Sequence, residues 1–301
     1  MGEKAGVLYV VATPIGNLGD MTPRACKVLT DVDLIACEDT RHSRPLLAHF
    51  GIDRPLAAYH EHNEQAQTPR LLEKLADGAS IALISDAGTP LVSDPGYVLV
   101  QQARSAGIVV VPVPGSSAPI CALSAAGLPS DRFLFLGFPP RGESARRDWI
   151  GAAAAEPGTL ILFEAGRRAA VTLADLADVL GPRQAVLARE LTKRFETFLA
   201  GELATLAEQV RADPQQQLGE CVILVAGARG GPDAGAEAEQ QRVLDPRSRR
   251  ASPAATATRS IAGRSPRGRL DAALRWAVVW LALFVCIAVG LSCVRGRRRP
   301  R

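Results

Sequence analysis

The chain has 301 residues, of which 47% are hydrophobic and 22% charged, and this composition excludes collagen-like, disulfide-scaffold and wholly disordered proteins. Its length suits about two domains of ~150 residues. The net charge of +4 is unevenly distributed, because residues 1–227 contain 20 Lys and Arg against 26 Asp and Glu, whereas residues 228–301 contain 15 against 5. The basic isoelectric point therefore does not indicate a body that binds nucleic acid over its whole surface.

The cysteines indicate neither a disulfide framework nor a metal site. None of the six belongs to a CxxC pair, and no histidine lies at metal-ligand spacing from them. The residues before the first apolar run lack the hydrophobic stretch of a secretory signal. We therefore expect a cytoplasmic protein with free thiols and no bound metal.

Short apolar runs alternate along the body with segments of helical character. The continuous hydrophobicity of the runs is typical of strands that are buried on both faces. Strands that alternate with helices predict a layered α/β architecture. The predicted strands are Leu8–Ala12, Val32–Cys37, Ser80–Ile84, Val109–Val113, Arg132–Gly137, Thr159–Phe163, Ala185–Ala188 and Cys221–Val225. The predicted helices are Thr22–Leu29, Thr68–Asp77, Gly96–Ser105, Ser117–Ala126, Glu143–Ala155, Arg168–Leu180 and Glu202–Arg211.

Loops rich in glycine and proline follow the first, third and fourth of these strands. Ligands of open α/β sheets bind outside the carboxyl ends of the strands, so we expect the functional site in these loops. After loop 13–18, Thr22 followed by Pro23 predicts the capped start of a helix. Loop 85–96 contains two carboxylates, which suit a cationic or hydroxyl-rich ligand better than a phosphate. Loop 112–118 brings small residues to a helix start, where a ligand can approach closely.

Five motifs in and beyond these loops form a recognisable set. They are Thr13–Leu18, Glu38–His42, Ser85–Gly96, Leu123–Phe133 and Ala188–Lys193. The set resembles the ribosomal RNA small subunit methyltransferase I family, a member of the tetrapyrrole methylase (class III) superfamily, from about Leu8 to Gly227. The resemblance implies two α/β domains with S-adenosylmethionine in the cleft between them. It also implies a homodimer and 2′-O-methylation of a cytidine ribose in 16S ribosomal RNA of the small ribosomal subunit.

The resemblance, read together with the loop chemistry, indicates candidate site residues. The cofactor is expected to contact Pro14, Gly16, Asp86, Ala87, Gly88, Thr89, Pro90, Asp94, Pro95, Gly96, Ser116, Ser117, Ala118, Phe163, Glu164, Ala188 and Arg189. Candidates for the general base or for stabilising developing charge are Glu38, Asp39, His42, Glu190 and Lys193, with the base left unassigned. The arginines expected to contact RNA are Arg41, Arg44, Arg141, Arg146, Arg147, Arg167, Arg168 and Arg194.

Two groups of aromatic and histidine residues are given structural interpretations. Phe133, Phe135 and Phe138 are interpreted as core residues in preference to a platform for RNA bases. His60 and His62 are interpreted as loop residues, because methyl transfer from a sulfonium needs no Lewis acid and no further matched ligands accompany them.

Two other functions stay open. A corrin-pathway tetrapyrrole methylase would share the fold, although such enzymes usually open with a GxGPGxxxLLT-like loop where this chain has Thr13–Leu18. A membrane-tethered RNA-binding scaffold that has lost activity would account for the unusual C-terminal part. Binding of the cofactor would separate this scaffold from both enzymes.

The C-terminal part departs from the family pattern. It is rich in arginine, lacks lysine, and contains an uncharged segment that would be ~28 Å long as a helix, close to the thickness of a bilayer core. A membrane anchor and a product of a shifted reading frame both account for it, so a contact with the cytoplasmic face of a membrane stays an alternative to a purely cytoplasmic location. The predicted organisation is an N-terminal α/β domain 1–114, a C-terminal α/β domain 115–227, a disordered linker 228–275, an apolar helix 276–294 and a basic end 295–301.

Overall fold

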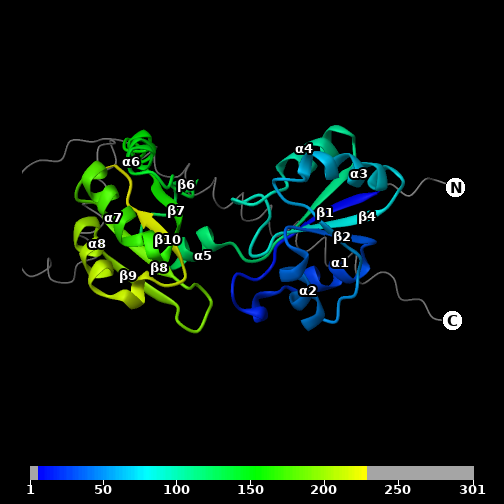
Figure 1. Ribbon diagram of the computed structural model, residues 1–301, viewed down its shortest axis with the longest axis horizontal. Coiled ribbons are helices and arrows are strands. Elements are labelled where there is room, and N and C mark those ends of the chain that lie inside the picture. Colours follow the sequence, from blue (N-terminus) through cyan, green and yellow to red (C-terminus); the bar gives the residue numbers. More distant parts are fainter. Residues whose placement is uncertain (1–5, 229–301) are drawn as a thin grey trace, which may run out of the picture. The chain divides into compact units, whose positions relative to one another are not determined.

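The computed structural model describes residues 6–228, which form two five-stranded sheets with helices packed against them (Figure 1). The predicted apolar helix, the basic end and the linker from residue 229 onward lie outside the described residues. Within residues 6–228, no helix combines the length and the hydropathy that crossing a membrane requires.

The first sheet is entirely parallel, with the order β3-β2-β4-β1-β5. Helices α1 (Pro23–Asp31) and α2 (Thr40–His49) cover one face, and α3 (Glu64–Ala76) and α4 (Tyr97–Ser105) cover the other (Figure 1). Because both faces are covered, the strands carry the continuous apolar runs seen in the sequence. The strands are β1 (Val7–Val11), β2 (Leu34–Cys37), β3 (Leu56–Ala58), β4 (Ser80–Ile84) and β5 (Val109–Val113).

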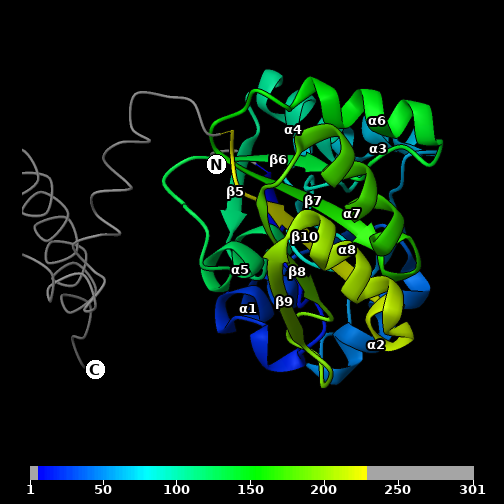
Figure 2. The ribbon, with the colours of Figure 1, turned by 90° about the vertical axis from the view of Figure 1, so that its left-hand side faces the viewer.

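The second sheet is mixed, with the order β6-β7-β10-β8-β9. Only β6 and β7 pair in parallel, and the other neighbours are antiparallel. The strands are β6 (Phe133–Gly137), β7 (Thr159–Ala165), β8 (Gln184–Arg189), β9 (Thr197–Glu202) and β10 (Glu220–Val225). Helix α5 (Ala118–Ala125) packs on one face, whereas α6 (Glu143–Ala152), α7 (Gly166–Leu180) and α8 (Leu203–Ala212) pack on the other (Figure 2).

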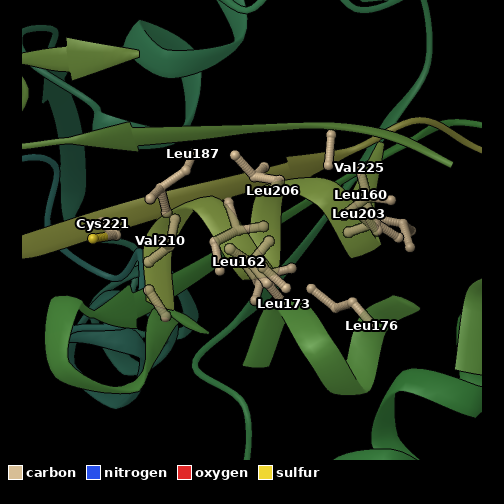
Figure 3. Close-up of a cluster of buried hydrophobic side chains, with 14 of the residues drawn as sticks. Leu160, Leu162, Leu173, Leu176, Leu187, Leu203, Leu206, Val210, Cys221 and Val225 are labelled. Atoms are coloured by element: carbon tan, nitrogen blue, oxygen red, sulfur yellow. The ribbon is translucent and has the colours of Figure 1, made fainter. Parts of the chain in front are cut away.

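The largest core cluster fills the space between the second sheet and its three helices. Leu162 of β7 and Leu187 of β8 point from the sheet toward Leu173 of α7 and Leu206 of α8 (Figure 3). All four side chains are fully buried, and burial of each leucine contributes about 1.5–3 kcal/mol. Glu164 near the end of β7, Glu190 directly after β8 and Glu220 at the start of β10 lie at the same end of these strands.

Local sequence signals place the start of α1. The Thr22 hydroxyl accepts a hydrogen bond from the backbone N–H of Ala25 at 3.1 Å, and Pro23 occupies the first helical position. This arrangement satisfies one of the free amides of the first turn and confirms the predicted capped start.

One α-helix and two strands were not predicted from the sequence. The segment around Glu38–His42, treated as a loop, in fact leads into helix α2 at Thr40. The short strand β3 and the strand β9 are both at sheet edges and lack a long apolar run. The predicted division between residues 114 and 115 stays a prediction; β5 ends at Val113, and α5, which begins at Ala118, packs on the second sheet.

Candidate functional site

Three loops at the carboxyl ends of β1, β4 and β5 are joined by hydrogen bonds. Thr13 and Gly88 exchange backbone hydrogen bonds of 2.8 and 3.1 Å, forming an isolated bridge between the first two loops. The Thr89 hydroxyl donates to the Ser116 carbonyl oxygen at 2.9 Å and so ties in the third loop. The three loops that were singled out in the sequence therefore lie side by side.

These loops and the strand ends of the second sheet enclose a cavity of about 440 Å³, which we call the main cavity. This volume lies within the usual range for small-molecule sites. The lining residues are Ile15, Glu38, Asp86, Ala87, Gly88, Thr89, Val92, Ser93, Asp94, Ser117, Ala118, Pro119, Phe138, Phe163, Glu164, Ala165, Glu190, Leu191, Lys193, Glu220, Cys221 and Val222.

Three carboxyl groups from the first sheet, those of Glu38, Asp86 and Asp94, make one side of the main cavity acidic. Burial raises the pKa of Asp94 to about 6, and the negative charge of Asp86 adds to this effect, while a hydrogen bond with Ser85 opposes it. Burial also raises the pKa of Glu38, as do the negative charges of Asp94 and Asp86. A cation bound here would relieve this repulsion.

Lys193 bridges two carboxylates on the other side of the main cavity. Its Nζ lies 3.0 Å from Glu190 Oε1 and 3.0 Å from Glu220 Oε2. Burial alone would lower the pKa of Lys193, but the two hydrogen bonds outweigh it and raise that pKa. Burial alone would raise the pKa of Glu190, but the hydrogen bonds from Lys193 and from the Glu220 amide lower it. Lys193 is therefore a cation and a poor proton acceptor near neutral pH.

Strained backbone is concentrated in two segments that line the main cavity. Leu91 and Ser93 have φ values of 73° and 65°, and Glu190 and Thr192 have 52° and 65°. Non-glycine residues rarely adopt this left-handed region, and such strain typically accumulates at functional sites. The close approach of Gly16 to the second of these segments also requires glycine, because a Cβ there would lie 2.5 Å from Lys193 Cγ.

Nine of the seventeen residues expected to contact the cofactor line the main cavity. They are Asp86, Ala87, Gly88, Thr89, Asp94, Ser117, Ala118, Phe163 and Glu164. The other eight lie in the same loops or strand ends but outside the lining. These are Pro14, Gly16, Pro90, Pro95, Gly96, Ser116, Ala188 and Arg189. Of the eight, Arg189 is buried and bonds Gln216 and Thr197, which indicates a structural role.

Only some of the candidate catalytic residues line the main cavity. Glu38, Glu190 and Lys193 line the main cavity, whereas Asp39 and His42 do not. The Asp39 carboxylate caps α2 by accepting a hydrogen bond from the Arg41 amide at 2.8 Å. Hydrogen bonds from Arg41 hold the pKa of Asp39 well below its usual range.

His42 acts on the main cavity through Asp86. Its Nδ1 lies 3.0 Å from Asp86 Oδ2, and this hydrogen bond raises the pKa of His42. The Asp39 amide donates to the other oxygen of Asp86 at 3.2 Å. Both oxygens of Asp86 are therefore held by the first turn of α2, which fixes this carboxylate at the wall of the main cavity.

The predicted RNA contacts include one clear correction. Arg146 is only 4% exposed, and its guanidinium pairs with the buried Asp175 at 2.5 Å, so it joins α6 to α7 and is not available to RNA. Arg147 also bonds Asp175 and Asp178. The Arg168 guanidinium is engaged within the protein as well, by Glu164 and by two proline carbonyls. The five that are exposed are Arg41, Arg44, Arg141, Arg167 and Arg194.

Phe133 and Phe138 were predicted to be core residues, and the prediction is wrong for both. Phe133 is 42% exposed on the edge strand β6, and the Phe138 side chain is 58% exposed and lines the main cavity. The pairing of β6 with β7 is irregular between Phe135 and Gly137, and Gly137 has a φ of 73°. Regular strand alternation would put Phe135 and Phe138 on opposite faces of the sheet, whereas here both rings contact Phe163.

Sequence reasoning also missed Glu220 and the lining residues around Val92 and Ser93. Glu220 begins the last strand, and only its pairing with Lys193 marks it as part of the site. No sequence signal distinguishes it from an ordinary surface glutamate. Val92 and Ser93 lie within the 85–96 motif, which marks the segment as a whole but does not single out these two side chains.

The chemistry of the main cavity fits S-adenosylmethionine, which carries a sulfonium cation, an amino acid group, ribose hydroxyls and an adenine. The acidic side suits the positive charge and the hydroxyls. Gly88, with a φ of 86°, leaves open backbone at the wall, where an added Cβ would meet Ile15 at 3.2 Å. Apolar groups such as Ile15, Val92 and Leu191 provide walls for a flat ring. Within residues 6–228, no group of three or more potential metal ligands is present.

The fold and the site define a class of protein that comparisons also identify. The family model "Tetrapyrrole (Corrin/Porphyrin) Methylases" matches residues 7–207, which places the chain in this class of methyltransferases. Uroporphyrin-III-C-methyltransferase from Thermus thermophilus has a similar fold, with a TM-score of 0.50 at 21% identity, over 78% of this chain and 96% of that one. The predicted arrangement of two α/β sheets is thereby confirmed.

Several relatives that share one description are much more similar to this chain in sequence than that structure is. Ribosomal RNA small subunit methyltransferase I from Pseudomonas aeruginosa is 58% identical over 245 residues, which is 80% of this chain and 86% of that protein. Its counterpart from Xylella fastidiosa (strain Temecula1) is 59% identical over 224 residues, or 74% and 82%. The chain belongs to the ribosomal RNA small subunit methyltransferase I family, as its motifs predicted, and is an enzyme.

Proposed function

We propose that this enzyme transfers a methyl group from S-adenosylmethionine to the 2′-oxygen of a cytidine ribose in 16S ribosomal RNA. Family membership supports methylation of small-subunit ribosomal RNA with this cofactor. The observation that carries the proposal is the main cavity, which has an acidic side for a cation and opposite it a lysine held between two glutamates.

The cofactor would lie among the three joined loops. Asp86, held by α2, and Asp94 would attract its positive charge, and the backbone from Asp86 to Thr89 would contact its polar groups. When bound, the cofactor supplies an activated methyl group. The protein's task is then to hold the acceptor hydroxyl in line with that group, and such orientation contributes up to about 7–11 kcal/mol in ideal cases.

Glu38 is the catalytic candidate best suited to accept the proton of the ribose hydroxyl. It lines the main cavity, and its pKa is raised by burial and by its acidic neighbours, which brings its basicity closer to the working pH. Lys193, whose pKa is raised, would instead stabilise negative charge on the acceptor. A positioned base typically contributes ~10²–10⁴ in rate.

The cellular setting that we propose follows from the family. The substrate would be the small ribosomal subunit in the cytoplasm, and the enzyme would act as a homodimer. Light scattering of the full chain at working concentration tests the second point, since a monomer that methylates at the full rate would contradict it.

The experiment that tests the proposed function is methyl transfer from labelled S-adenosylmethionine to 30S subunits that lack the modification. Label on the 2′-oxygen of a single cytidine, mapped on the RNA, is the expected result. Glu38→Gln should lower kcat by about 10²-fold or more while cofactor affinity is kept. Label on a base, or transfer to a tetrapyrrole acceptor in place of RNA, would contradict the proposal.

A further inference from the structure

A second cavity of about 350 Å³ adjoins the main cavity, and we call it the arginine cavity. It shares Phe138, Glu164 and Ala165 with the main cavity, so the two cavities are neighbours at these residues. Its full lining is Phe138, Pro139, Pro140, Arg141, Glu164, Ala165, Arg167 and Arg168. The residues that line only the arginine cavity include no proposed cofactor contact and not the proposed base.

The two cavities have opposite charge. The main cavity has six lining carboxylates (Glu38, Asp86, Asp94, Glu164, Glu190 and Glu220) against the single cation Lys193. The arginine cavity has three arginines against the single carboxylate Glu164. A polyanion is therefore repelled from the main cavity and attracted to the arginine cavity beside it.

One of the three arginines, Arg168, is held by contacts within the protein. Arg168 lies 3.4 Å from the buried Glu164 carboxylate and donates to the carbonyl oxygens of Pro139 and Pro140 at 3.3 and 3.0 Å. The same carboxylate accepts a hydrogen bond from Thr172 at 2.6 Å. Glu164 and Arg168 thus neutralise each other and hold the proline segment that forms one wall.

The side chains of the other two arginines are not held in this way within residues 6–228. The side chains of Arg141 and Arg167 are exposed and make no ion pair or hydrogen bond with any residue between 6 and 228. The backbone of Arg141 is nevertheless fixed, because its carbonyl oxygen accepts a hydrogen bond from the buried Arg146 at 3.1 Å. Two free guanidinium groups on a fixed frame suit a phosphate, which accepts paired hydrogen bonds from arginine.

An aromatic ring stands at the boundary of the two cavities. Phe138 is 58% exposed, and its ring packs against Phe163 with the ring centroids 5.2 Å apart. Phe163 in turn packs against Phe135 at 4.9 Å. Phe138 is therefore braced from behind while its free side is open, which is the arrangement on which unpaired RNA bases stack.

We propose that the arginine cavity binds the nucleotide next to the methylated one, with its phosphate at Arg141 and Arg167 and its base against Phe138. This inference rests on the proposed function and deepens it, because it assigns a site that positions the RNA strand. A phosphate held here places the neighbouring ribose over the main cavity. Arg168 and Glu164 are positioning residues for this site and do not themselves contact the RNA.

The test compares the full chain with Arg141→Ala and Arg167→Ala, using unmodified 30S subunits and labelled S-adenosylmethionine. Arg70→Ala is the matched control, since Arg70 is an exposed arginine on α3 that lines neither cavity. Each cavity variant should raise KM for subunits about tenfold with unchanged cofactor affinity. The slope of log affinity against log salt should become shallower by about 0.7 per arginine removed.

A second pair of variants tests the stacking surface. Phe138→Leu should raise KM for subunits about tenfold, and Phe138→Trp should restore it, because stacking needs an aromatic face and not a particular ring. Tyr97→Leu is the control, as Tyr97 is 66% exposed and lines neither cavity. A packing role alone would not be rescued by the larger ring.

The outcomes separate this inference from the proposed function. If the wild-type chain methylates the cytidine ribose but the cavity variants behave like Arg70→Ala and Tyr97→Leu, the arginine cavity is not a nucleotide site and the proposed function stands. Loss of cofactor affinity in Arg141→Ala or Arg167→Ala would also overturn the inference, since it would assign them to the main cavity. Failure of the wild-type chain to methylate subunits would instead reject the proposed function.

Discussion

At the scale of single residues, Asp94 makes the main cavity sensitive to pH. Its pKa of about 6 lies above the ordinary value of 3.8 because burial disfavours the charged form. Between these two values the folded protein binds a proton that the unfolded chain does not, so ionised Asp94 costs stability above pH 6. The same negative charge attracts a cationic ligand. The ionised form of Asp94 therefore lowers the stability of the free protein but favours binding of the ligand.

Asp94→Asn should therefore weaken cofactor binding and stabilise the free protein at pH 8. Calorimetry of the wild type should show affinity for S-adenosylmethionine falling as the pH is lowered from 8 to 5, and the variant should lose much of this dependence. The variant's Tm at pH 8 should rise by about 2–4 °C, as expected for ~1 kcal/mol in a protein of this size. At pH 4, where Asp94 is protonated, the two Tm values should converge.

An affinity for the cofactor that does not change in Asp94→Asn would show that Asp94 is not part of the cofactor site. If affinity is unchanged in Asp94→Asn across this pH range, the positive charge of the ligand lies elsewhere in the main cavity. Ser93→Ala serves as the control, because it changes a neighbouring lining side chain without changing the charge.

At the scale of elements, α6 and α7 are joined by a buried ion pair. Arg146 and Asp175 have side chains that are 5% and 7% exposed, and Arg147 supplies a second guanidinium to Asp175 at 3.0 Å. A buried pair is seldom a large net source of stability, but removal of one partner leaves the other charged and desolvated.

Arg146→Ala should destabilise the protein by about 3 kcal/mol in denaturant unfolding, near the lower end for a broken buried pair because Arg147 still contacts Asp175. The double variant Arg146→Met with Asp175→Leu should recover most of that loss. Affinity for RNA should fall less than in Arg141→Ala under conditions where the variant is folded, because Arg146 acts on RNA only by holding the Arg141 carbonyl oxygen. Weaker RNA binding without any loss of stability would instead support the original interpretation of Arg146 as an RNA contact.

The same scale shows what the sequence can and cannot predict. Apolar runs located eight of the ten strands, although two of the eight, β5 and β6, are edge strands with exposed residues. Their continuous hydrophobicity cannot tell parallel from antiparallel pairing, since β7, β8 and β10 are buried on both faces and yet pair antiparallel. Helix α2 was missed because its sequence is polar and contains Pro45, which weakens the helical signal.

For the candidate site, glycine-rich and acidic motifs correctly indicated which loops meet, because backbone approach and charge leave local signals. They could not show which side chains line a cavity. Asp39 and Glu38 are adjacent in the chain, yet one caps a helix and the other faces the main cavity. Arg141 and Arg146 are five residues apart and were both expected to contact RNA, and only the fold shows that Arg146 is buried.

At the scale of the whole molecule, the second sheet depends on the last strand described. Strand β10 lies at its centre and pairs with both β7 and β8. Beyond the strand, the Ala226 amide donates to the Gln184 carbonyl and the Ala228 amide to the Glu156 carbonyl, each at 2.8 Å. The lining of both cavities ends at Val222. The described contacts of the second sheet therefore extend to Ala228.

We expect a chain that ends at Ala228 to keep the unfolding midpoint and the cofactor affinity of the full chain, because it retains every lining residue and both terminal hydrogen bonds. A chain that ends at Leu218 should fail to form the second sheet, since it lacks the central strand and the Glu220 partner of Lys193. Circular dichroism and calorimetry with S-adenosylmethionine measure both points, and methylation of 30S subunits by the Ala228 chain shows whether RNA contacts also survive. A chain ending at Ala228 that binds cofactor normally but no longer methylates would assign the RNA contact to residues after 228. Loss of folding in that chain would show that the second sheet needs more than its own strands and helices.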